Sequence, residues 1–155
     1  MLNKIVKALI ESRDFISVAT ADLNNRPNAA PKFLLKIQGD FIYLVDYIIG
    51  RTYENLKINP QISLSFFDSS TLIGYQVNGR VEIIKSGAEY ATVLKELQAK
   101  EIDLSTKRVI EGVTRGKAHQ TYEVAIPEKF VIFKVKVDEI VEMSPRGTLK
   151  REKIS

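Results

Sequence analysis

Alternating apolar and polar residues predict that much of this chain forms short β-strands. The clearest alternation runs from Tyr75 to Ile83, where every second residue is apolar or glycine and the others are polar or charged. A period of two buries one row of side chains and leaves the other in water. Composition and alternation predict further strands at 15–21, 28–37, 41–46, 61–67 and 130–137, the last continuing to residue 143.

Helical periodicity is weaker and confined to a few segments. In residues 2–13, Ile5, Val6, Leu9 and Ile10 form one apolar stripe, which predicts an amphipathic helix. Residues 88–100 show a similar stripe, and residues 51–60 predict a short helix that ends at a proline. The segment 101–124 has no clear pattern. We expect a short helix near 106–113 and then a loop around 114–117.

Two residues inside predicted strands indicate local irregularity. Pro31 lies within 28–37, and a proline cannot donate to a β-ladder, so we expect a sheet edge or a bulge there. Gly79 takes an apolar position in the alternating strand, which indicates a bend or a close backbone approach.

These elements predict a mainly β fold. About six antiparallel strands with two or three flanking helices favour a Greek-key split β-barrel, because closure removes exposed strand edges. With 155 residues, no internal repeat and no linker, we expect one domain spanning 1–155.

Composition excludes several kinds of metal site and a membrane-spanning segment. The chain is 45% hydrophobic and 27% charged, it has no cysteine, and His119 is its single histidine. Thiolate and multi-histidine metal centres are therefore excluded, and we expect no metal. We expect His119 to be a surface residue rather than a haem ligand. No apolar run approaches the length of a membrane span, so we expect a cytoplasmic protein without membrane contact.

The net charge of +4 does not indicate nucleic-acid binding. Four of the 23 basic residues and one of the 19 acidic residues lie from Pro145 onward, so this tail carries +3 of the total. The remainder is nearly neutral and shows no basic stripe. We expect residues 145–155 to form a loose basic tail and the protein to bind no nucleic acid.

The start of the predicted helix at 51–60 is the best candidate for an anion site. Unpaired backbone N–H groups and the positive end of the helix dipole favour an anion there, and Arg51 and Thr52 add a guanidinium and a hydroxyl. A cation at this end is unfavourable without a bound anion. Lys32, next to Pro31, is a second candidate, with Lys36 as its rival.

Several motifs, taken in order, resemble those of the pyridoxamine 5′-phosphate oxidase-like proteins, which have an FMN-binding split β-barrel. Residues 15–21 followed by Asn25-Arg26-Pro27 resemble the family's opening strand and turn. Pro31-Lys32-Phe33-Leu34-Leu35-Lys36 resembles its second strand. Gly50-Arg51-Thr52, Asn55-Leu56 and Asn59-Pro60 resemble its phosphate-binding loop and helix. Residues 74–82 resemble its long strand beside the flavin.

The resemblance implies FMN as the cofactor and a homodimer with the cofactor cleft at its interface. It implies that Arg51, Thr52 and Lys32 or Lys36 hold the phosphate, and that backbone near Val45 and Asp46 borders the flavin ring. The cofactor-binding residues expected from the motifs are Lys32, Phe33, Leu34, Lys36, Val45, Asp46, Arg51, Thr52, Asn55 and Gln76. No catalytic residue can be named.

The sequence also departs from the family pattern. Many members have lysine where Thr52 stands, and the oxidases themselves have glutamine at Gly74. This chain lacks tryptophan and the C-terminal Arg-Leu-x-Pro motif, so pyridoxamine phosphate oxidase activity is not expected. Three functions remain open: an FMN-dependent oxidoreductase acting on a small molecule, a non-catalytic flavin-binding or electron-carrier protein, and a split barrel that binds haem or another anionic cofactor.

Overall fold

A computed structural model describes residues 1–47, 49–114 and 129–154. The chain divides into two compact units, Met1–Ile84 with Phe130–Ser155, and Lys85–Lys129. The described residues contain three helices and seven strands. The helices are α1 (Lys4–Glu11), α2 (Arg51–Ile58) and α3 (Ala88–Thr114). The strands are β1 (Phe15–Ala21), β2 (Pro27–Gln38), β3 (Phe41–Asp46), β4 (Gln61–Asp68), β5 (Ile73–Ile84), β6 (Val131–Met143) and β7 (Leu149–Lys153).

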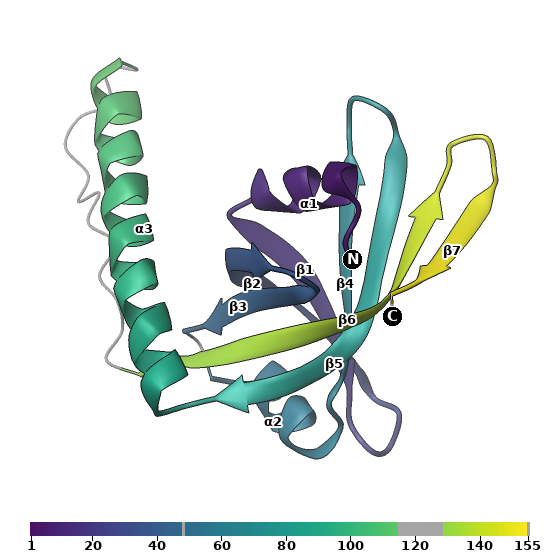
Figure 1. Ribbon diagram of the computed structural model, residues 1–155, viewed down its shortest axis with the longest axis horizontal. Coiled ribbons are helices and arrows are strands. Elements are labelled where there is room, and N and C mark those ends of the chain that lie inside the picture. The colour runs from purple at the N-terminus through teal and green to yellow at the C-terminus, as the bar shows by residue number, and fades with distance from the viewer. Residues whose placement is uncertain (48, 115–128, 155) are drawn as a thin grey trace. The chain divides into compact units, whose positions relative to one another are not determined.

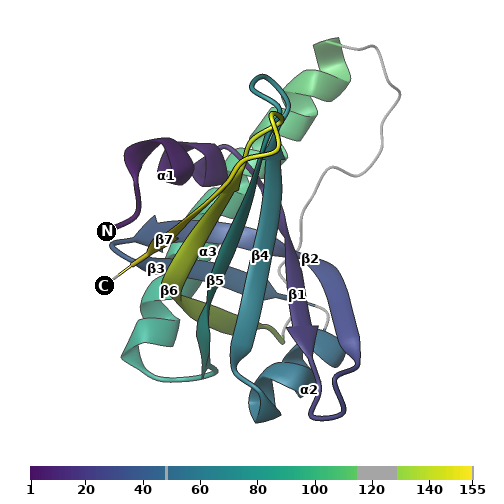
Figure 2. The ribbon, with the colours of Figure 1, turned by 90° about the vertical axis from the view of Figure 1, so that its right-hand side faces the viewer.

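The larger unit is a closed antiparallel barrel, as the sequence predicts. Its strands follow the order β3-β2-β1-β4-β5-β6, and a pairing between β3 and β6 closes the ring. The first three strands form the expected meander, and α1 and α2 lie toward opposite ends of the barrel (Figures 1 and 2). The prediction of a six-stranded antiparallel barrel with flanking helices is confirmed.

Alternate residues of the strands fill the barrel interior. In β1 the residues Ile16, Val18 and Thr20 are buried, while their neighbours along the strand are exposed or half-buried. Helix α1 adds Val6 and Ile10 to this core. Because apolar side chains fill the centre, a ligand site of this fold has to be sought at the barrel's ends or on its outer surface.

The two irregular positions behave as the sequence predicts. Strand β3 pairs only with residues 33–38 of β2, so Pro31 has a strand on one side only and lies at an edge. The β2–β3 bulge comes later, between Leu34 and Lys36. A Cβ on Gly79 would lie 2.2 Å from the carbonyl oxygen of Lys136, so the close backbone approach requires glycine.

Helix α3 is longer than the sequence predicts. A single helix runs through Ala88–Thr114 where two separate helices, 88–100 and 106–113, were expected. Residues 101–105, between them, contain no glycine or proline, and Glu101 and Leu104 have high helix propensity, so nothing interrupts the first helix. The rest of the predicted loop and His119 lie outside the described residues.

The polar segment after Pro145 forms a hairpin with β6, where the sequence predicted a loose tail. Strand β7 pairs antiparallel with β6, with Met143 opposite Leu149 and Glu139 opposite Lys153. The turn between them is closed by a hydrogen bond from Ser144 N–H to the Thr148 carbonyl (2.8 Å), and Gly147 has a φ of +84°. This turn accounts for the strand, because it returns a short polar segment to the open edge of β6.

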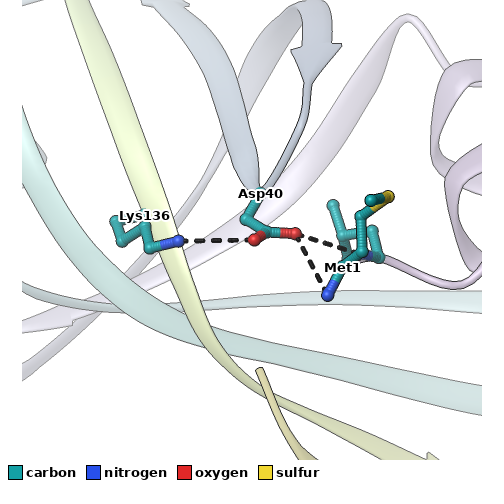
Figure 3. Close-up of polar contacts among 4 residues, drawn as sticks. Met1, Asp40 and Lys136 are labelled. Atoms are coloured by element: carbon teal, nitrogen blue, oxygen red, sulfur yellow. Dashed lines mark hydrogen bonds and ion pairs between the residues drawn. The ribbon is translucent and has the colours of Figure 1, made fainter. Parts of the chain in front are cut away.

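Polar contacts attach the start of α1 to the barrel (Figure 3). The Met1 amino group lies 3.5 Å from Asp40 Oδ1, to which the Leu2 N–H also donates at 3.1 Å. The Lys136 ammonium lies 3.5 Å from Asp40 Oδ2. Partial desolvation opposes ionisation of Asp40, but these positive charges and the Leu2 hydrogen bond leave its pKa lower than usual.

Candidate functional site

The first turn of α2 has the open donors that a bound anion requires. Gly50 occupies the N-cap position, and no side chain of the described residues caps the helix. Most helices use a Ser, Thr, Asp or Asn oxygen at this place. Here the backbone N–H groups of the first turn keep their capacity to bind an external acceptor.

Arg51 is the first residue of this helix, and its side chain is exposed. Within the part of the chain that the structure describes, its guanidinium makes no hydrogen bond or ion pair. The acidic residue of the same turn, Glu54, lies 3.4 Å from Lys57. The Arg51 guanidinium is therefore available to an anion at the helix start.

Side-chain amide groups hold α2 against β1 and β2. Asn28 Nδ2 donates to Thr52 Oγ1 at 3.1 Å, and Asn55 Nδ2 donates to Thr20 Oγ1 at 3.1 Å. Thr52 and Asn55 are only 2% and 4% exposed. Since Thr52 accepts from Asn28, its own hydroxyl proton is left for another acceptor, whereas the Asn55 amide serves to dock the helix.

The structure brings Lys32 of β2 and Asp46 of β3 together. The Lys32 ammonium lies 2.7 Å from Asp46 Oδ1, and the two side chains are 9% and 1% exposed. Ile16, a core residue, is the ladder partner of Lys32 on β1, so Lys32 lies on the inner face of the sheet. The sequence proposed these two residues separately and did not predict that they pair.

The remaining predicted residues of β2 and β3 lie on both faces of the sheet. Leu34 belongs to the core, 1% exposed. Phe33 is opposite Val45 in the β2–β3 ladder, and its ring packs edge-on against Tyr47, with the centroids 6.1 Å apart. The Lys36 ammonium lies 4.8 Å from the Tyr43 ring centroid, past the bulge and on the opposite face from Lys32. Lys32, not Lys36, is thus the lysine on the same face as the α2 contacts.

Gln76 is not joined to this cluster within one chain. Its Nε2 donates to Ser63 Oγ at 3.1 Å, on the outer face of β4 and β5. The next polar residue on that face, Asn78, donates to Glu139 Oε2 at 2.9 Å, and Arg151 lies 3.2 Å from the same oxygen. The Asn78 hydrogen bond, opposed by partial desolvation and aided by Arg151, lowers the pKa of Glu139.

The sequence motifs did not identify Asn28 and Thr20, which contact α2 in the structure. Thr20 occupies a buried position in the alternation of β1, and Asn28 is its ladder partner on β2. A polar residue at an apolar position of a strand is the signal that could have identified Thr20 as the partner of a buried group.

The described residues contain neither a cluster of metal ligands nor a membrane-spanning helix. No group of three or more His, Cys, Asp or Glu side chains is placed to hold a metal ion in residues 1–47, 49–114 and 129–154. In the same residues, no helix has the length and apolarity needed to cross a bilayer.

Comparisons with solved structures place the fold among known proteins. A Clostridium acetobutylicum protein related to general stress protein 26 of B. subtilis has a TM-score of 0.70 and 20% identity, over 97% of this chain and 92% of that one. HupZ of Group A Streptococcus has a TM-score of 0.65 and 24% identity, over 97% and 99%. A pyridoxamine 5′-phosphate oxidase-related, FMN-binding protein of Nostoc punctiforme has a TM-score of 0.59 and 14% identity, over 100% and 99%.

A search of curated proteins found no match. The family model of pyridoxamine 5′-phosphate oxidase, by contrast, matches residues 2–144. That match includes β1, β2, β3 and α2, the elements that carry the candidate site. The chain therefore belongs to the pyridoxamine 5′-phosphate oxidase family.

Proposed function

We propose that this protein binds FMN and serves as a flavin-dependent oxidoreductase for a small molecule. The observation that carries the proposal is the first turn of α2, where no described side chain caps the helix and the Arg51 guanidinium has no partner among the described residues. A phosphate there would accept hydrogen bonds from the backbone, from Arg51 and from the Thr52 hydroxyl.

Electrostatics favours a bound anion over a solvated arginine. A cation in the first turn of a helix is disfavoured by about 0.3–1 kcal/mol, because the dipole's positive end lies there. A phosphate reverses the sign of that interaction and adds charge-assisted hydrogen bonds, which are about twice as strong as neutral ones. The residues at this helix start therefore fit the phosphate of FMN.

Family membership and one similar solved structure support flavin as the ligand. The Nostoc protein is described as FMN-binding, and its fold resembles this one. The sequence has one compact anion site and no glycine-rich loop for a pyrophosphate, so FMN fits better than FAD. By the family resemblance, backbone near Val45 and Asp46 would border the ring.

The flavin, when bound, supplies the two-electron redox chemistry. The protein's residues would bind its phosphate, orient its ring and exclude water. We do not propose pyridoxamine phosphate oxidation, because Gly74 stands where those oxidases have glutamine and their C-terminal substrate motif is missing. The proposed substrate is a different small molecule, and the cytoplasmic location stays a prediction.

A homodimer would complete the cleft in this proposal. The outer face of β1 and β4 carries small side chains in register, with Ser17 opposite Ser65 and Ala19 opposite Ser63, and β5 continues it with Gln76 and Asn78. Surface strands usually carry lysine and glutamate on such a face. A face of small, uncharged side chains suits two-fold packing against a second copy. Gln76, which donates to Ser63 within one chain, would then lie on the face that meets the partner.

The absorbance spectrum of freshly purified protein tests flavin binding. Bound FMN gives the absorbance bands of an oxidised flavin, whereas a Soret band would show haem instead. Steady-state oxidation of a reduced nicotinamide by the yellow protein then tests turnover. A yellow protein that oxidises no nicotinamide beyond the rate of free FMN would favour the non-catalytic carrier, and a colourless protein that takes up no added FMN would contradict the proposal.

A further inference from the structure

The Thr52 hydroxyl is a buried donor in the first turn of α2. Thr52 is the second residue of the helix and is only 2% exposed. Its Oγ1 accepts a hydrogen bond from Asn28 Nδ2 at 3.1 Å. Among the described residues, no group accepts the Thr52 hydroxyl proton. A hydroxyl has one proton to donate, so Thr52 keeps this capacity for an acceptor other than the described residues.

The place of Thr52 in the helix decides where that acceptor would lie. The Cα–Cβ bonds of a helix tilt toward its N-terminus, so the Thr52 side chain extends toward the helix start. There, no described side chain caps the backbone N–H groups. Thr20 accepts an amide at the same distance, but it is a strand residue, and its donor Asn55 is the fifth of the eight residues of α2. The Thr52 hydroxyl therefore adjoins the uncapped N–H groups, whereas the Thr20 contact lies further along the helix.

Asn28 fixes the direction in which Thr52 can donate. The pairing of β1 with β2 holds Asn28 opposite Thr20, and its side chain is half-buried. An amide NH₂ group only donates, so the Thr52 proton cannot be given to the Asn28 nitrogen that contacts it. With one acceptor position occupied in this way, the Thr52 hydroxyl serves as a donor to another group.

We propose that Asn28 is a positioning residue that keeps the Thr52 hydroxyl as a donor to the flavin phosphate. The inference rests on the proposed function, since it concerns the same FMN phosphate. Asn28 acts through Thr52 and does not itself contact the ligand. Its consequence is selective: Asn28 strengthens the binding of FMN and has no effect on riboflavin, which carries no phosphate.

Asn28→Asp reverses the polarity of this contact with little change in the size of the side chain. A carboxylate only accepts hydrogen bonds, so the Thr52 hydroxyl would donate to it. The phosphate then loses the Thr52 donor and meets an added negative charge. We expect FMN affinity to fall by roughly tenfold or more and riboflavin affinity to stay as in the wild type.

The experiment separates the lost donor from the added charge. Flavin-free wild type, Asn28→Asp, Thr52→Val and the double variant are titrated with FMN and with riboflavin, following flavin fluorescence. In the Thr52→Val background only the repulsion remains, so Asn28→Asp should cause a loss of FMN affinity that is about two- to tenfold smaller than in the wild type. Asn24→Asp, at an exposed position in the turn between β1 and β2, is the matched control for charge. It should keep FMN affinity within about threefold of wild type.

Two results would overturn the inference. Equal losses for Asn28→Asp with and without the Thr52 hydroxyl would show that Asn28 does not act through Thr52. Equal losses for FMN and riboflavin would show that Asn28 only docks α2. If Asn28→Asp does not fold, Asn28→Ala takes its place. It should reduce FMN affinity by about twofold or more in the wild type and not in the Thr52→Val background, and no loss in the wild type would likewise overturn the inference.

The inference and the proposed function fail in distinguishable ways. If wild type binds FMN more tightly than riboflavin but Asn28→Asp and Thr52→Val act independently, only the inference is contradicted. If the coupling is found but the FMN-loaded protein oxidises no nicotinamide, only the proposed turnover is contradicted. No flavin binding by the wild type overturns both.

Discussion

Two basic regions of the molecule differ in how their charge is used. At the start of α2 there is one exposed cation, Arg51, with no partner among the described residues and with uncapped backbone N–H groups beside it. Strand β7 has more charge, with Lys150, Arg151 and Lys153 against Glu152. Its Arg151 lies 3.2 Å from Glu139.

The difference shows that the number of charges does not locate a binding site. All five residues of β7 are exposed, and water and salt screen their charges. The α2 start combines an exposed guanidinium with backbone N–H groups that no described side chain caps.

The largest expected effect is that of Arg51→Ala on FMN affinity. Loss of a charge-assisted hydrogen bond to phosphate should cost about 1.5–3 kcal/mol, or roughly ten- to a hundredfold in affinity. Fluorescence titration measures it. Arg146→Ala, in the β6–β7 turn, removes the same charge and should have no effect. If both variants bind FMN like wild type, the phosphate does not lie at α2.

A smaller loss is expected for Thr52→Val, which removes the hydroxyl but keeps the shape of the side chain. A neutral hydrogen bond contributes about 0.5–1.5 kcal/mol, or roughly two- to tenfold in FMN affinity. Thr20→Val is the matched control, because Thr20 also accepts an asparagine amide at 3.1 Å. Calorimetric titration should show a loss for Thr52→Val alone. Equal losses for both would mean that docking of α2, and not a phosphate contact, is what Thr52 contributes.

Deleting residues 150–155 should change FMN affinity by less than about threefold, although it removes a net charge of +2. The deletion removes most of β7 and leaves the edge of β6 unpaired, so the melting temperature should fall, by roughly 2–4 °C for each kcal/mol lost. Thermal unfolding and FMN titration of the same sample measure both. A tenfold loss of FMN affinity would place β7 at the ligand site, in its own or a partner chain.

The smallest effect is expected for Glu139→Gln, and it depends on pH. The folded state lowers the pKa of Glu139 below its ordinary 4.5, chiefly through the Asn78 hydrogen bond. The ionised carboxylate therefore stabilises the fold above pH 4.5, and this contribution disappears as the pH falls through the folded-state pKa. The stability gap between wild type and variant, measured by urea unfolding, should narrow below pH 4.5. A constant gap from pH 7 to pH 3 would contradict the assignment.

Most of the barrel could be predicted because apolar and polar residues alternate along its strands. Phe15–Ala21 and Phe41–Asp46 were predicted with the bounds observed, since turn residues flank both. Strand β7 was missed because its side chains are all exposed and show no alternation. Backbone hydrogen bonds to β6 hold it, and these leave no trace in hydropathy.

The candidate site was only partly predictable. Arg51 and Thr52 could be predicted as site residues because the signals that mark a helix start are local in the sequence. The Lys32–Asp46 pair depends on how β2 and β3 align around a bulge between Leu34 and Lys36. A bulge shifts which residues share a face, so neighbouring strands have to be placed before such a pair can be recognised.

Titration of flavin-free wild-type protein with FMN and with riboflavin tests the central claim most directly. The two ligands share the ring and the ribityl chain and differ only in the phosphate. If the start of α2 holds that phosphate, FMN should bind at least about tenfold tighter than riboflavin, and Arg51→Ala should abolish the difference. Equal affinities for the two flavins in the wild type would contradict a phosphate site at Arg51.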